Sequence, residues 1–149
     1  MNFLADTNLV SELTKAEPSP SVIRWMRQND AWVFLSWISV AELRSGVLSL
    51  PPGKKRTSLQ QDVEEFIADY YDEDRLRLTG PTADRYAGLV SSRKRAGIQC
   101  GFADTVIAAV ALEHGLTVVT RNAKDFPDVP TVNPWNEEAA GDDADGLED

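Results

Sequence analysis

Four acidic residues in separate parts of the chain have the type and placement needed for metal chemistry. They are Asp6, Glu42, Asp104 and Asp125. Asp6 comes directly after a short apolar segment that predicts a strand, and Asp125 lies just past another such segment. The other two acids lie near the starts of predicted helices. Two carboxylates about 5 Å apart, at an effective dielectric of about 20, repel by roughly 3 kcal/mol, so such a group takes up protons or binds a cation. Hard oxygen ligands favour Mg²⁺ or Mn²⁺.

Each of these acids also has a purely structural interpretation. Asp6 could cap the helix that follows it, and Asp104 could favour the start of its own helix. Glu42 could be a solvated helix residue, and Asp125 could be a turn residue before Phe126. Any one of these interpretations is reasonable by itself. Together they would require four acids to gather at one edge of a sheet by accident.

The hydrophobic pattern predicts the elements that position these acids. Apolar spacing predicts helices at residues 8–15, 21–29, about 38–50, 57–73, 82–96 and 103–114. Short apolar or alternating segments predict strands at residues 2–5, 32–36, 75–79, 116–120 and 130–132. Strands that alternate with helices indicate a parallel sheet covered on both faces. We therefore expect a three-layer α/β/α sandwich with a five-stranded parallel sheet, whose function lies at the carboxyl ends of its strands.

The charge of the chain is unevenly distributed. The net charge of the 149 residues is −9, and residues 136–149 hold seven acids and no Lys or Arg. Removing those seven charges leaves −2 for residues 1–135, which is compatible with a nucleic-acid partner. The composition predicts one folded domain over residues 1–135 and a disordered acidic tail over residues 136–149.

Several other functions lack the residues that they need. His114 is the only histidine, which removes Ser-His-Asp and Cys-His nucleophile schemes. Cys100 is the only cysteine, so no intrachain disulfide can form and a reducing cytoplasm suits the chain. No GxGxxG or GxxxxGK[ST] motif is present. The start does not have the pattern of a signal peptide, and no apolar stretch nears the ~18 residues of a membrane span.

Three motifs resemble those of PIN-domain ribonucleases. LADTNLVSEL resembles the first strand and helix of the family, ISVAELRSG its second acidic motif, and FADTVIAAVALEHGLTVVTRNAKDF its long third motif. Their order and spacing are similar to the VapC and FitB-like branch, the toxins of type II toxin–antitoxin systems. The resemblance implies a five-stranded parallel sheet, a carboxylate site for Mg²⁺ or Mn²⁺, endonuclease action on RNA, and a homodimer.

The resemblance also assigns roles to residues. Asp6, Glu42 and Asp104 match the three metal-binding acids of the family. At the fourth position many relatives carry an Asp, whereas this chain has Asn122, with Asp125 as the next acid. An Asn can bind a metal through its carbonyl oxygen but adds no charge.

Other residues have supporting roles in this interpretation. Thr7 and Thr120 are expected to orient the acids. The cations expected to hold the RNA backbone are Arg44, Arg93, Lys94, Arg95 and Arg121.

The resemblance further implies a VapB-type antitoxin as partner. We expect it to cover an apolar face and to reach a basic side chain into the acidic cluster. This face comprises Leu9, Val10, Leu13, Val22, Trp25 and Met26.

Two alternatives stay open at this point. A non-enzymatic, receiver-like α/β module would need an acid next to Asp6 and a lysine after the last strand, and neither is present. A metal-dependent phosphatase normally carries a DxD turn, where this chain has Asp6-Thr7-Asn8. An assay that compares RNA with small phosphoesters would separate these functions.

Overall fold

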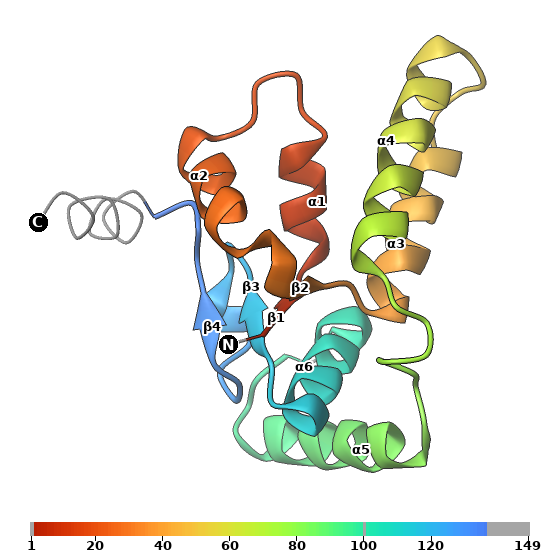
Figure 1. The fold of residues 1–149 in the computed structure, drawn as a ribbon. Coiled ribbons are helices and arrows are strands. Elements are labelled where there is room, and N and C mark those ends of the chain that lie inside the picture. The colour runs from red at the N-terminus through yellow and green to blue at the C-terminus, as the bar shows by residue number, and fades with distance from the viewer. Residues whose placement is uncertain (1, 100, 137–149) are drawn as a thin grey trace, which may run out of the picture.

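The protein is built around a parallel sheet with its first strand at the centre. The computed structural model describes residues 2–99 and 101–136, and within them the sheet has four strands in the order β2-β1-β3-β4 (Figure 1). The strands are β1 (Phe3–Ala5), β2 (Val33–Phe34), β3 (Thr117–Val119) and β4 (Thr131–Val132). Leu4 is paired with Phe34 on one side and with Val118 on the other, so the carboxyl ends of β1 and β3 lie next to each other.

Helices make up most of the remaining chain. They are α1 (Thr7–Leu13), α2 (Pro20–Asn29), η1 (Asp30–Trp32), α3 (Trp37–Leu48), α4 (Lys54–Tyr70), α5 (Gly80–Arg95), α6 (Phe102–His114) and η2 (Ala123–Asp125). Local chemistry sets several ends: Pro20 begins α2, the Ser36 hydroxyl accepts the Ser39 amide to cap α3, and Gly115 ends α6 with a φ of 64°. All six predicted α-helices are therefore confirmed, with bounds shifted by a few residues.

Alternating strand residues face two separate cores. Phe3, Ala5 and Val119 pack under α1 to α4, whereas Leu4 and Val118 pack against α5 and α6. This two-sided burial is the reason why the strands are apolar throughout. Figure 1 shows α1 and α2 on one side of the sheet, α5 and α6 on the other, and the α3–α4 hairpin beside them. The predicted three-layer arrangement is confirmed.

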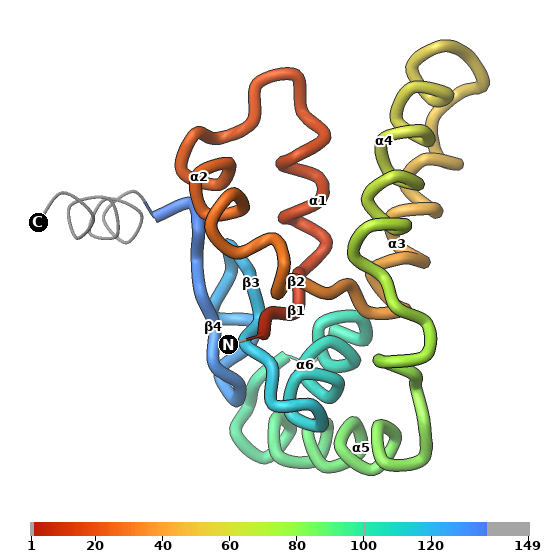
Figure 2. The backbone as a smooth tube through the Cα atoms, viewed as in Figure 1, coloured from red at the N-terminus to blue at the C-terminus, as the bar shows by residue number. Residues whose placement is uncertain are grey.

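The predicted strand at residues 75–79 is wrong, so the sheet has four rather than five strands among the described residues. The Asp72 side chain accepts hydrogen bonds from the amides of Asp74 and Arg75 and bends the chain into a turn. Leu76 is buried in the α5–α6 core while Leu78 remains 45% exposed. Figure 2 shows this segment running from the end of α4 to the start of α5, away from the sheet.

The end of the described chain is fastened to α1. The indole Nε1 of Trp135 donates a 2.7 Å hydrogen bond to Glu12, which is only 6% exposed and is also paired with Lys15. The guanidinium of Arg121 lies 5.7 Å from the centroid of the Trp135 ring. The predicted tail lies outside the described residues apart from Asn136. None of the described helices is long and apolar enough to cross a membrane.

Candidate metal and nuclease site

Asp6 is the residue between the central strand β1 and helix α1. Its amide continues the β1–β3 pairing by donating to the Val119 carbonyl at 3.0 Å. Its carboxylate does not accept the hydrogen bond from the second or third amide of α1 that defines a helix cap, so the capping interpretation does not explain this residue. Instead one carboxylate oxygen accepts hydrogen bonds from the Thr120 hydroxyl at 3.0 Å and from the Asn8 amide at 3.4 Å.

Burial dominates the electrostatics of Asp6. The side chain is 7% exposed, and this burial raises the pKa of Asp6 to about 6, helped by the carboxylates of Asp104 and Glu42. Hydrogen bonds from the Thr120 hydroxyl and the Thr7 amide act in the opposite direction. The fold therefore places a partly uncompensated carboxylate at the end of its central strand.

Thr120 and Thr7 contact the acids that they were expected to orient. Thr120 is fully buried and accepts the Asn122 amide at 3.0 Å while it donates to Asp6, which links β1 to the loop after β3. The Thr7 hydroxyl donates a 2.8 Å hydrogen bond to the exposed Glu42 on α3. Each threonine thus reduces the freedom of one acidic side chain.

Asp104 lies in the first turn of α6, which begins after Gly101. Burial raises the pKa of Asp104, the carboxylates of Asp125 and Glu42 raise it further, and Arg93 opposes them. Asp125 ends the short η2 helix in the loop after β3. The carboxylates of Glu42 and Asp125 therefore act on the pKa of Asp104, and those of Asp104 and Glu42 act on the pKa of Asp6, although the four acids come from four segments.

The side chains do not form a closed ligand cage. Within residues 2–99 and 101–136, no three His, Cys, Asp or Glu side chains form a group that could hold a metal ion in the positions seen. The donor set itself is all oxygen and carries several negative charges, which suits a hard divalent cation. Two of these acids already have raised pKa values, which a bound cation would reverse.

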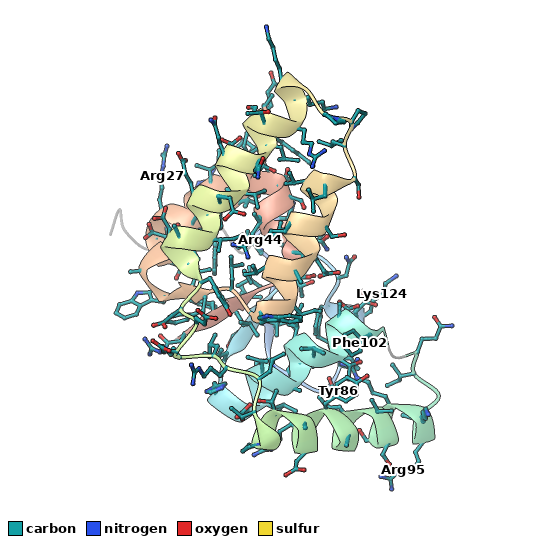
Figure 3. The ribbon with its side chains drawn as sticks, turned by 90° about the vertical axis from the view of Figure 1, so that its right-hand side faces the viewer. Arg27, Arg44, Tyr86, Arg95, Phe102 and Lys124 are labelled. Carbon is teal, nitrogen blue, oxygen red and sulfur yellow. The ribbon has the colours of Figure 1, made fainter. Side chains whose placement is uncertain are left out.

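Four of the five cations expected to bind RNA lie on the surface, and one does not. Arg93 is only 1% exposed and pairs with Asp128, so the prediction that it contacts RNA is wrong. Arg44 is paired with Glu64 of α4 through two hydrogen bonds. Among the described residues, Arg95 donates hydrogen bonds only to Ser91 of its own helix, and Figure 3 shows it pointing outward from α5, away from Lys124.

Exposed cations remain in the loop after β3 and in the last turn of α5. Arg121 directly follows Thr120 and is exposed, as is Lys124. Lys94 is also exposed, next to the buried Arg93. Of the exposed cations among those predicted, Arg121 is the one that lies in the same loop as Asn122 and Asp125.

The apolar face expected to bind an antitoxin is mostly core. Leu9, Val10 and Val22 have no exposed surface, and Trp25 and Met26 are 8% and 7% exposed. Trp25 meets Phe3 of the central strand edge to face at 4.9 Å between ring centroids. The prediction of this interface is wrong because α1 and α2 use the face to cover the sheet. Leu13, which is only partly buried, is the sole exception.

An apolar area is instead exposed near the start of α6. Phe102, Trp37 and Leu78 are 64%, 50% and 45% exposed. Leu78 and Phe102 line a hollow of about 260 Å³ together with Tyr86, and Leu78 also lines the neighbouring hollow beside Trp37. Figure 3 shows Tyr86 and Phe102 projecting from α5 and α6 toward each other. Sequence analysis missed this face because its residues come from three segments.

Comparison with known proteins gives consistent matches over most of the chain. A family model described as "PIN domain" matches residues 3–132. The chain is 39% identical to Toxin FitB of Neisseria gonorrhoeae over 140 residues, which cover 91% of this chain and 99% of that protein. It is 38% identical to VapC ribonuclease Y4jK of Sinorhizobium fredii, covering 89% of this chain and 97% of that one. A crystal structure of FitAcB from Neisseria gonorrhoeae superimposes with a TM-score of 0.79 at 38% identity, over 90% of this chain and 99% of the other.

Proposed function

Because this chain belongs to the PIN domain family, we propose that it is a divalent-metal-dependent endoribonuclease that hydrolyses RNA phosphodiester bonds. We further propose that it is the toxin of a type II toxin–antitoxin pair, given its similarity to Toxin FitB and to a VapC ribonuclease over nearly its whole length. A toxin that cleaves cellular RNA would act in the cytoplasm, and we propose this localisation for the chain.

The observation that carries the proposal is the buried carboxylate of Asp6 among other acids. With a pKa of about 6 and the carboxylates of Asp104 and Glu42 acting on it, Asp6 is ionised at neutral pH against an unfavourable local field. A divalent cation would relieve this repulsion. Asp6 and Asp104 are the residues that would hold Mg²⁺ or Mn²⁺, with Glu42 as a third ligand.

The chain's own residues would divide the remaining work. A bound divalent cation would lower the pKa of the attacking water and would offset negative charge at the phosphodiester. Glu42, oriented by the Thr7 hydroxyl, can accept the proton of that water if it does not act as a ligand. Thr120 keeps Asp6 in place, and the exposed Arg121 next to it can hold an RNA phosphate.

The fourth acidic position combines two residues in this proposal. Asn122 offers an uncharged carbonyl oxygen, and Asp125 acts on the pKa of Asp104. We propose that Asp125 supplies the negative charge that Asn122 lacks. Because Asn122 itself brings no charge to the fourth position, a second metal ion would still bind more weakly than the first.

Two kinds of protein partner follow from this function. A VapB-type antitoxin would hold the nuclease inactive by placing a basic side chain among the acids. A second copy of the chain is also expected, and the exposed apolar area of Trp37, Leu78 and Phe102 supports it, since monomers rarely expose large contiguous apolar patches. Light scattering of the purified chain checks this stoichiometry, and a monomer would contradict the homodimer.

Replacement of Asp104 with Asn tests the enzymatic function. Cleavage of RNA is measured with Mg²⁺ or Mn²⁺, with a chelator, and in parallel on a small phosphoester. Asp104→Asn should lose RNA cleavage with its circular dichroism spectrum unchanged, because one ligand charge disappears. Asp84→Asn, an exposed acid of α5, is the matched control and should cleave normally. Wild-type rates from folded Asp104→Asn would contradict the metal-site assignment.

A further inference from the structure

A buried arginine joins the segments that carry two of the acids. Arg93 of α5 is 1% exposed, and its Nε and Nη2 donate hydrogen bonds of 2.8 and 2.9 Å to the two carboxylate oxygens of Asp128. Its Nη1 lies 3.3 Å from the Thr105 hydroxyl, and its Nη2 also donates to the Asp125 carbonyl at 3.2 Å. One guanidinium therefore contacts α6 and the loop after β3 at the same time.

These contacts need an arginine rather than any cation. The guanidinium is a planar fork that binds a carboxylate through two parallel hydrogen bonds and still has donors left for other acceptors. A buried positive charge is costly unless it is paired and hydrogen-bonded, which gives the surrounding groups fixed places. The hydrogen bonds from Arg93 lower the pKa of Asp128, as expected for a tight pair.

The partners of Arg93 adjoin the acidic cluster. Thr105 follows Asp104 directly, and its hydroxyl also donates to the Gly101 carbonyl at 2.7 Å, in the first turn of α6. Asp125 is held by its backbone carbonyl, which leaves its carboxylate available. Arg93 thus connects the turn that carries Asp104 to the loop that carries Asp125.

We propose that Arg93 is a positioning residue that fixes Asp104 and Asp125 relative to each other for metal binding. This inference rests on the proposed metal-dependent function. The residue acts through Thr105 and through the backbone of Asp125, and it does not contact the metal or the RNA.

A charge effect and a positioning effect would change metal affinity in opposite directions. Burial and neighbouring carboxylates raise the pKa of Asp104 and Arg93 opposes them, so its positive charge is felt at the site. Removing that charge alone would strengthen the binding of a cation. Removing a residue that holds metal ligands in place typically weakens metal binding by 10–100-fold.

The test measures the affinity for Mn²⁺ of folded protein, by calorimetry or electron paramagnetic resonance, for Arg93→Met and Arg93→Lys. Both variants should bind Mn²⁺ at least about tenfold more weakly. The lysine keeps the charge but cannot contact Asp128, Thr105 and Asp125 together. Asp128→Asn, which keeps the size of the partner and leaves Arg93 in place, provides the same comparison if Arg93→Met does not fold.

Two control variants separate positioning from other effects. Arg95→Met removes the same charge from the same helix, but within the described part of the chain the hydrogen bonds that it breaks are those to Ser91. Leu89→Ala lowers stability from the buried face of α5, where Leu89 is 6% exposed. Both should bind Mn²⁺ within about twofold of wild type, whereas a merely structural role for Arg93 would make Arg93→Met behave like Leu89→Ala.

The outcomes distinguish this inference from the function that it rests on. Unchanged or tighter Mn²⁺ binding by folded Arg93→Met, with wild-type protein that cleaves RNA, would overturn the positioning role alone. Mn²⁺ binding by wild-type protein that cleaves no RNA would overturn the proposed activity and leave the positioning role standing. Wild-type protein that binds no Mn²⁺ would overturn both.

Discussion

Replacing Asp6 with Asn should make the metal-free protein more stable at neutral pH and inactive. The pKa of Asp6 rises from 3.8 to about 6, chiefly through burial. At about 1.36 kcal/mol per pKa unit, ionising this side chain in the folded state costs roughly 3 kcal/mol more than in the unfolded chain. An Asn has nearly the shape of the protonated acid, and its carbonyl oxygen can still accept the Thr120 hydroxyl that now bonds to Asp6.

The effect should depend on pH in a defined way. Since the folded-state pKa of Asp6 lies above the unfolded-state value, its favourable contribution is full below pH about 4 and is lost as the pH rises through about 6. The stability of Asp6→Asn relative to wild type should therefore be near zero at pH 4 and approach about 3 kcal/mol at pH 8. In a protein of this size that equals roughly 6–12 °C in melting temperature.

Urea unfolding of both proteins between pH 4 and pH 8 in the presence of a chelator measures this difference. Asp62→Asn, an exposed acid on α4, controls for the general loss of a negative charge. Added Mg²⁺ or Mn²⁺ should stabilise wild type more than Asp6→Asn, because the variant lacks a ligand. A stability difference that stays constant from pH 4 to pH 8, or a variant less stable than wild type at pH 8, would refute the reasoning.

Two further predictions concern the end of the chain. Trp135→Phe should lower the free energy of unfolding by roughly 1.5–3 kcal/mol, because the 2.7 Å hydrogen bond to the nearly buried Glu12 is lost. Trp32→Phe, at a residue that is 54% exposed, should cost little. Equal losses for the two variants in chemical denaturation would count against the Trp135–Glu12 contact. Truncation after Trp135 removes seven acids and should speed RNA cleavage at low salt. This advantage should shrink as salt is added, because the Debye length falls to ~8 Å at physiological ionic strength and becomes shorter still at higher salt. If the truncated and full-length proteins cleave RNA at equal rates at both low and high salt, the tail has no electrostatic effect on RNA.

The positions of the acids could be predicted because parallel strands end at one edge of the sheet. Asp6 and Asp125 follow strands that the apolar pattern already indicates, and α6 is apolar enough to place Asp104 near buried structure. The structure brings these acids within electrostatic reach of one another. Their chemical roles remain predictions.

The burial of Arg93 could not be predicted from the local sequence. Arg93, Lys94 and Arg95 are neighbours of similar charge, and only the first faces inward. Which one is buried depends on Asp128, 35 residues further along the chain, and on how α5 packs on α6. Helical spacing gives the relative directions of the three side chains but not the direction of the core.

Two other errors have local causes. Residues 75–79 alternate like a strand, but the Asp72 turn and the absence of a neighbouring strand leave them as a connection. The apolar residues of α1 and α2 were predicted to bind an antitoxin, but all except Leu13 are buried in the core. They are needed because two helices and the α3–α4 hairpin share a single face of the sheet.

The order of strands in the sheet has a consequence for synthesis. The central strand β1 is synthesised first, yet it pairs with β3, which comes much later in the chain. Thr120, which donates a hydrogen bond to Asp6, follows Asp6 by 114 positions. At about 5–20 residues per second, a ribosome needs roughly 6–23 seconds to reach Thr120 after Asp6. Asp104 is added 16 residues before Thr120, and Asp125 five residues after it. A partly made chain therefore cannot assemble the proposed nuclease site before Asp125 has been added, so any activity of that site would arise only after this point of synthesis.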